Sequence, residues 1–147
     1  MRMFCLILVA LSAMSQTSKA ASDKQRLIGA WHLASMVGPD GKPVPGELPK
    51  AMLIYTRDGH MSVQLMYPAA ASSLSNEYVK NGYEASFGSY DVNEATHTLT
   101  HHVAGANTGG LLVGKDLPLV YEFNKVGEMV IRSARADERW SVRWEHY

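Results

Sequence analysis

The sequence predicts an all-β protein, an eight-stranded antiparallel up-and-down barrel. From Arg26 onward, short strand-like runs alternate with clusters of turn residues. No long segment has the 3.6-residue period of an amphipathic helix. The links between consecutive runs are short, which places sequence neighbours side by side and favours a barrel over a sandwich. Such a barrel has no exposed edge strand and encloses its own side chains or one small ligand.

Residues 1–20 have the composition of a secretory signal peptide. Residues 4–11 form a short apolar stretch, and small residues precede an expected cleavage site after Ala20. The stretch is too short to span a membrane. Cys5, the one cysteine, is not preceded by the small residues of a lipoprotein cleavage site. We therefore expect one barrel domain over residues 21–147, periplasmic or secreted, with no disulfide and no stable membrane anchor.

Turn residues divide the expected domain into eight strands, and we expect the first strand to pair with the last. The expected strands cover residues 26–37, 51–57, 60–66, 85–92, 97–103, 119–124, 128–134 and 139–147. The one helix candidate, residues 73–81, lies between the third and fourth strands.

The second and third strands are joined by Asp58-Gly59, a dipeptide typical of a two-residue type I′ hairpin turn. That turn would pair Arg57 with His60. Register decides which side chains face the core, because a slip of one residue turns a strand over. The expected register gives one entirely apolar face, formed by Met52, Ile54, Met61, Val63 and Leu65. The opposite face would hold Leu53, Tyr55, Ser62 and Gln64.

Several segments resemble the lipocalin-like domain family. The first strand opens with Gly29-Ala30-Trp31, a Gly-x-Trp motif, and the resemblance continues through residues 53–64, 87–92 and 98–103. The resemblance implies an eight-stranded barrel with a central cavity. It also implies a closed end where Trp31 packs against an arginine of the last strand, for which Arg143 is the better placed candidate.

Candidate ligand-binding residues follow from the expected faces. His101 shares its expected face with Phe87 and Ser89, which is more apolar than the face of His102, so we place His101 inside. The wall of the cavity is then expected to include Met61, Val63, Phe87, His101, Tyr121 and Trp140. The open end is expected to be rimmed by residues 67–82 and 104–116, the longest non-strand connections.

Two functions fit this pattern. The first is binding of a small hydrophobic or amphipathic molecule in the barrel. The second is an isomerase, cyclase or lyase that uses the pocket histidine, His101, as a general base. A filled, purely structural barrel and a histidine satisfied by hydrogen bonds are the alternatives. Balanced charge, with 14 basic and 14 acidic residues, argues against nucleic acid, and no motif indicates a metal or a cofactor.

Overall fold

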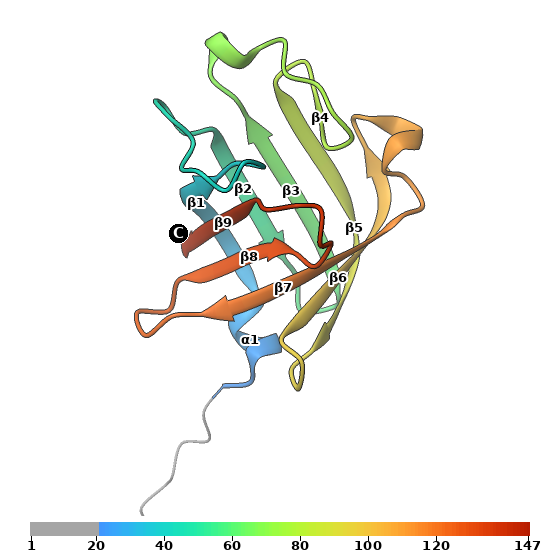
Figure 1. Cartoon of the computed structure of the whole chain (residues 1–147). Helices are drawn as coiled ribbons and strands as arrows, with labels where there is room; N and C mark the ends of the chain where they lie inside the picture. The colour runs from blue at the N-terminus through green and yellow to red at the C-terminus, as the bar shows by residue number, and fades with distance from the viewer. Residues whose placement is uncertain (1–20) are drawn as a thin grey trace, which may run out of the picture.

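The computed structural model describes residues 21–147 and shows a closed antiparallel barrel (Figure 1). Its eight strands are β1 (Gly29–Val37), β2 (Lys50–Tyr55), β3 (His60–Met66), β5 (Tyr83–Asn93), β6 (Thr98–Ala106), β7 (Asp116–Phe123), β8 (Met129–Ser133) and β9 (Ser141–His146). Neighbours in sequence pair with each other, β1 pairs with β9, and β3 pairs with β5. A short strand, β4 (Val79–Lys80), adds to the edge of β5. The predicted fold class is confirmed, including the pairing of the first and last strands.

The helices are short. One, α1 (Asp23–Leu27), includes Arg26, where we expected the first strand to start. A capping box formed by Ser22 and Gln25 stabilises the beginning of this helix. A helical turn does lie between the third and fourth barrel strands, but it is the 3₁₀ turn η1 (Ala69–Ala71), so the predicted position at residues 73–81 is wrong. A second 3₁₀ turn, η2 (Gly109–Leu111), precedes β7. Within residues 21–147, no helix is both long and apolar enough to cross a membrane.

The side chain of Asn76 accounts for the missing helix at residues 73–81. Its amide oxygen accepts hydrogen bonds from the backbone N–H groups of Tyr78 and Val79, at 2.8 and 2.9 Å. A side chain that binds the backbone in this way competes with helical hydrogen bonds and favours a turn. The chain therefore turns at Asn76 and continues as β4.

The predicted register of the β2–β3 hairpin is wrong by one residue. Tyr55 pairs with Met61, because Thr56 and His60 close a three-residue loop in which Gly59 alone has a positive φ, 89°. This loop is a turn followed by a glycine bulge, and it replaces the two-residue type I′ turn that Asp58-Gly59 suggested.

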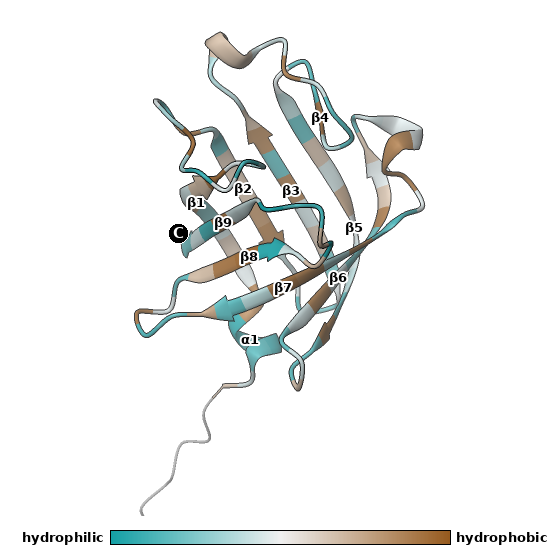
Figure 2. Ribbon diagram, in the orientation of Figure 1, coloured by the Kyte–Doolittle hydropathy of each residue, from teal (hydrophilic) through white to brown (hydrophobic). Residues whose placement is uncertain are grey.

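The slip turns β2 over and leaves β3 as predicted. Leu53 and Tyr55 face inward and are each 1% exposed, whereas Met52 faces outward and is 42% exposed. On β3, Met61 and Leu65 are buried in the core. Figure 2 shows the resulting alternation of hydrophobic and hydrophilic residues along the strands.

One end of the barrel is closed by α1. Leu27 and Trp31 are both 0% exposed, and the indole Nε1–H of Trp31 donates to the backbone oxygen of Leu27 at 2.8 Å. The hydroxyl of Tyr121 donates to the carboxylate of Asp23 at 3.2 Å. These contacts join the helix to β1 and β7, so this end is packed and hydrogen-bonded.

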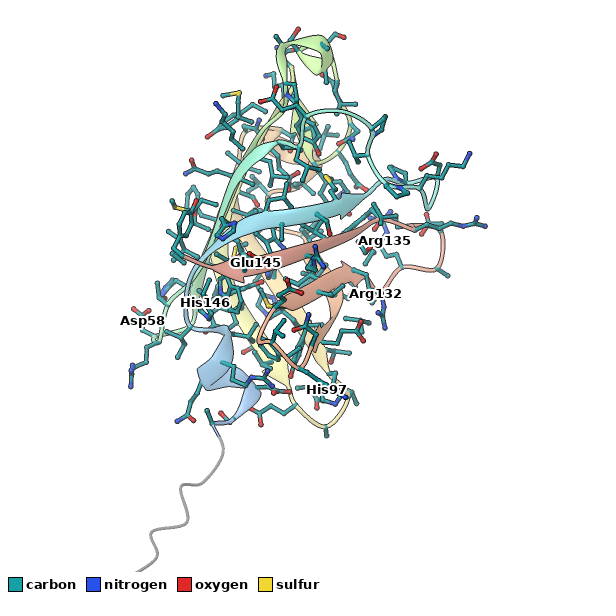
Figure 3. The ribbon with its side chains drawn as sticks, turned by 90° about the vertical axis from the view of Figure 1, so that its left-hand side faces the viewer. Asp58, His97, Arg132, Arg135, Glu145 and His146 are labelled. Carbon is teal, nitrogen blue, oxygen red and sulfur yellow. The ribbon has the colours of Figure 1, made fainter. Side chains whose placement is uncertain are left out.

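His146, not Arg143, covers Trp31. The two rings stack with centroids 3.5 Å apart and planes 29° from parallel, and Figure 3 shows His146 at the end that holds α1. Arg143 lies between the inward-facing Val142 and Trp144, so the alternation of a strand directs it outward, where it pairs with Glu128 at 3.6 Å. The predicted Trp31–Arg143 contact is therefore wrong.

Alanine substitutions of Trp31 and Arg143, the two residues that the family resemblance paired, should differ in their effect on stability. Trp31→Ala removes a fully buried aromatic side chain and should lower the free energy of unfolding by about 3–5 kcal/mol. Arg143→Ala removes only an exposed ion pair and should lower it by less than about 1 kcal/mol. Urea unfolding of both variants measures the difference. Equal small effects would show that Trp31 does not seal the barrel.

Candidate functional site

Packing inside the barrel changes from one end to the other. Near α1 most inward-facing side chains are sealed, as Leu99, Tyr121 and Met129 illustrate with exposures of 0–1%, while Val92 and Phe123 are partly buried. Toward the opposite end, several inward-facing positions are partly accessible to solvent, although Leu65 is buried. These positions are Leu33, Ala51, Val63, Glu84, Leu117 and Ser133, together with Trp140 just before β9. The open half of the barrel is therefore less completely filled than the closed half.

His101 lies inside the barrel at the boundary between these halves. It is 7% exposed, and its Nε2 lies 2.7 Å from the hydroxyl oxygen of Tyr55. Burial lowers the pKa of His101 to about 3 and raises that of Tyr55 well above its usual value, so both groups are neutral. Tyr55 then donates its one hydroxyl hydrogen to Nε2, which leaves the hydrogen on Nδ1. Among the described residues, Nδ1 has no hydrogen-bond partner.

The strand neighbours of His101 differ from those expected. It pairs with Tyr90, because Asn93 rather than Val92 lies opposite Thr98. Tyr90 also faces inward, and its hydroxyl donates to the backbone oxygen of Thr56 at 2.9 Å. The position of His101 inside the barrel thus agrees with our expectation, although the faces of β5 were assigned the wrong way round.

Glu84 is an inward-facing carboxylate that the sequence analysis missed. It pairs with Leu65 on β3 and Val79 on β4, which are 3% and 2% exposed. The part of the chain that the structure describes offers its carboxylate no hydrogen bond or ion pair. Removal from water raises the pKa of Glu84 from 4.5 to about 7. The expected strand began one residue later, at Ala85, so Glu84 was left in the preceding loop.

Tyr67 follows β3 at the same end of the barrel as Glu84, and its backbone N–H donates to the backbone oxygen of Gly82 at 2.9 Å. It packs against the core cluster at the end of β3. Its pKa is raised to about 12, mainly by burial and also by the negative charge of Glu84. The open half of the barrel therefore combines apolar side chains with a carboxylate and a phenol.

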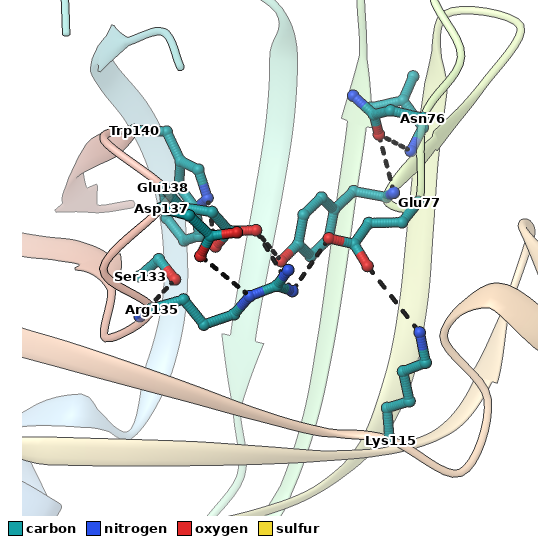
Figure 4. Close-up of polar contacts among 10 residues, drawn as sticks. Asn76, Glu77, Lys115, Ser133, Arg135, Asp137, Glu138 and Trp140 are labelled. Atoms are coloured by element: carbon teal, nitrogen blue, oxygen red, sulfur yellow. Dashed lines mark hydrogen bonds and ion pairs between the residues drawn. The ribbon is translucent and has the colours of Figure 1, made fainter. Parts of the chain in front are cut away.

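Charged residues from three loops meet across the open end (Figure 4). The guanidinium of Arg135, after β8, lies 3.0 Å from Glu77 and 3.4 Å from Glu138. Lys115, before β7, contacts the same Glu77 at 3.9 Å. These ion pairs connect the β3–β5, β6–β7 and β8–β9 connections, so the open end is bridged by side chains rather than sealed by a helix.

Two aromatic side chains join this bridge through Glu138. The hydroxyl of Tyr78 donates to Glu138 Oε1 at 2.9 Å, and the indole N–H of Trp140 donates to Oε2 at 3.2 Å. Burial and this carboxylate raise the pKa of Tyr78. The rings of Tyr78 and Trp140 meet edge to face with centroids 6.4 Å apart. An aromatic pair thus lies directly beneath the charged bridge.

Phe87 is outside the barrel, so its predicted place on the inner wall is wrong. It is 58% exposed, and its ring covers Gly105, its partner on β6, so closely that a Cβ at that glycine would clash with the ring. Phe87 borders a broad hollow of about 680 Å³ whose lining is mostly outward-facing. In the same region, His102 bridges Asp116 and Asp91 at 2.6 and 2.9 Å.

The other predicted wall residues face inward but do not form one site. Met61 lies in the closed half, and Tyr121 contacts α1 there. Val63 and Trp140 belong to the open half, and His101 lies between the halves. Five of the six predicted wall residues therefore face the interior, but they are divided between the closed half, the open half and the boundary between them.

Replacement of Glu84 by glutamine should stabilise the protein at alkaline pH. The folded-state pKa is above the unfolded value, so stability is highest below about pH 4.5 and falls as pH rises through about 7. The glutamine side chain would carry no charge, so Glu84→Gln should raise the unfolding free energy by about 1–3 kcal/mol at pH 8 and change it little at pH 4. Urea unfolding at both pH values measures this. A loss of stability at pH 8 would show that the carboxylate has a stabilising partner.

Comparisons with known proteins agree with the fold. The model of the lipocalin-like domain family matches residues 28–115. Among solved structures, the chain is similar to a lipocalin-like protein from Bacteroides uniformis, with a TM-score of 0.52 and 12% identity over 83% of this chain and 99% of that one. It is also similar to an uncharacterized protein from Bacteroides eggerthii, with a TM-score of 0.50 and 13% identity over 82% and 99% of the two chains.

No curated protein matches the chain significantly. The identities to the two Bacteroides proteins are low, so those likenesses concern the fold alone. The family match, in contrast, covers more than half of the sequence and includes the Gly-x-Trp tryptophan Trp31 and the interior histidine His101. The chain therefore belongs to the lipocalin-like domain family.

Proposed function

We propose that this protein binds a small hydrophobic or amphipathic molecule in the open half of its barrel. The observation that carries the proposal is the change in packing along the interior. Most side chains around Trp31 are sealed, whereas inward-facing side chains such as Ala51 and Leu117 at the other end remain partly accessible. A barrel with a purely structural role has no need for this asymmetry, because an eight-stranded barrel can fill its whole interior with side chains.

The lining of the open half supports a mainly apolar ligand. Val63, Leu117 and Trp140 provide apolar and aromatic surface. The polar groups are few, and two of them, Glu84 and the Nδ1 of His101, have no partner among the described residues. Ligand pockets commonly combine such a surface with a small number of polar groups that orient the ligand.

The chemistry of His101 supports binding over catalysis. A general base works best with a pKa near the working pH. The pKa of His101 is about 3, and Nε2 is already occupied by the hydroxyl of Tyr55. An imidazole in this state can donate a hydrogen bond through Nδ1 but is a weak proton acceptor. We therefore assign His101 to ligand orientation and do not propose the isomerase, cyclase or lyase alternative.

We further propose that the protein acts outside the cytoplasm, in the periplasm or after secretion. The proposal rests on the signal-peptide composition of residues 1–20, which lie outside the described residues. A hydrophobic ligand has low solubility in water, and a barrel with one accessible end would carry it through an aqueous compartment. Neither a membrane anchor nor a nucleic acid partner is part of this proposal.

Filling the open half should abolish binding without unfolding the barrel. Ala51 faces inward and its neighbour Met52 faces outward on the same strand, so Ala51→Phe and Met52→Phe add aromatic bulk on opposite faces of one wall. We expect the fluorescence of Nile red to rise on addition of the protein. Ala51→Phe should weaken probe binding by about tenfold or more, because the added ring occupies ligand space, while Met52→Phe should bind as the parent does.

Thermal unfolding of both variants controls for loss of structure. The proposal fails if the parent protein binds no apolar probe. It also fails if a folded Ala51→Phe variant binds as tightly as the parent, since the probe would then lie outside the open half.

A further inference from the structure

The carboxylate of Glu84 has an unusual position for a charged group. It extends from β5 into the barrel, between Leu65 and Val79 on the neighbouring strands, and both of these side chains are buried. Its inward direction follows from the unbroken β3–β5 register, in which Ser86 and Gly88 on the same face are buried as well. The carboxylate is thus fixed by regular strand pairing and not by a mobile loop.

Two cations in the loops at the open end, Arg135 and Lys115, form ion pairs with other carboxylates. Arg135 contacts Glu77 and Glu138, and Lys115 contacts Glu77. Among the described residues, no ion pair joins either cation to Glu84. A carboxylate without a partner in a mainly apolar setting is costly, and proteins compensate such groups or use them to bind a ligand.

We infer that the ligand carries a positively charged amine on an apolar body, and that Glu84 forms an ion pair with this amine inside the barrel. The inference rests on the proposed function and specifies its ligand class. An ammonium group would give the carboxylate the charge-assisted hydrogen bonds that the described chain does not provide. Tyr67, whose backbone N–H donates to Gly82 two residues before Glu84, brings a phenol to the same end of the barrel.

The same geometry disfavours an anionic ligand. A fatty carboxylate placed beside Glu84 would set two like charges close together where solvent screens them poorly. A neutral alcohol could donate one hydrogen bond to Glu84 but would bring no charge. For ligands with the same alkyl chain, we therefore expect affinity to fall from the amine to the alcohol to the carboxylate.

Competition against Nile red tests this order. Dodecylamine, dodecanol and dodecanoate share one alkyl chain, and at pH 8 the amine is a cation and the acid an anion. Below their micelle-forming concentrations, dodecylamine should displace the probe at a concentration about ten times lower than dodecanoate. Glu84→Gln should remove most of this preference. Glu122→Gln, which deletes the same charge from an exposed position on β7, should keep it.

The outcomes separate this inference from the proposed function. If the three compounds displace the probe equally, or if a folded Glu84→Gln or Glu84→Ala variant keeps the amine preference, the head-group assignment is wrong and hydrophobic binding stands. If the parent protein binds neither the probe nor any of the three compounds, the proposed function fails and the ligand class fails with it. An amine preference that is lost only in the Glu84 variants supports the inference.

Discussion

The seal at one end of the barrel is the contact on which the rest of the structure depends. Trp31 is fully buried, hydrogen-bonded to the backbone of Leu27, and stacked beneath His146. It joins α1 to the first and last strands of the barrel, because β1 and β9 pair at this point. A barrel closed in this way has a complete core in one half. The remaining half can then stay partly open without loss of the fold, because burial near Trp31 already provides a packed core.

Two inward-facing polar groups in the barrel are expected to lower the free energy of unfolding rather than to stabilise the fold. Glu84 faces the interior and is partly buried, and neither its carboxylate nor the Nδ1 of His101 has a partner among the described residues. Three loops nevertheless converge above them through the ion pairs of Arg135, which bridge the open end. Inward-facing polar groups without a partner in the described chain, together with the polar bridge above them, are the basis of the proposed ligand site.

The sequence predicts the barrel well because turn residues and strand-like runs are local signals that repeat along the whole chain. Register is harder to predict, since it depends on loop geometry. Asp58-Gly59 suggested a two-residue turn, yet one bulge at Gly59 places Tyr55 opposite Met61 and turns β2 over. The same type of error misplaced Phe87, whereas Arg143 could have been assigned outward from its alternation with Val142 and Trp144.

The site was predicted less completely than the fold, because its key residue stands at a strand boundary. Glu84 precedes the expected strand by one residue, and only the β3–β5 pairing shows that it faces the interior. Methyl NMR during titration with dodecylamine tests the account most directly. Ala51, Val63 and Leu117 methyl signals should shift, while those of Leu27, Leu99 and Met129 remain in place. Shifts confined to residues that border the outer hollow, such as Ala104, would contradict a ligand site inside the barrel.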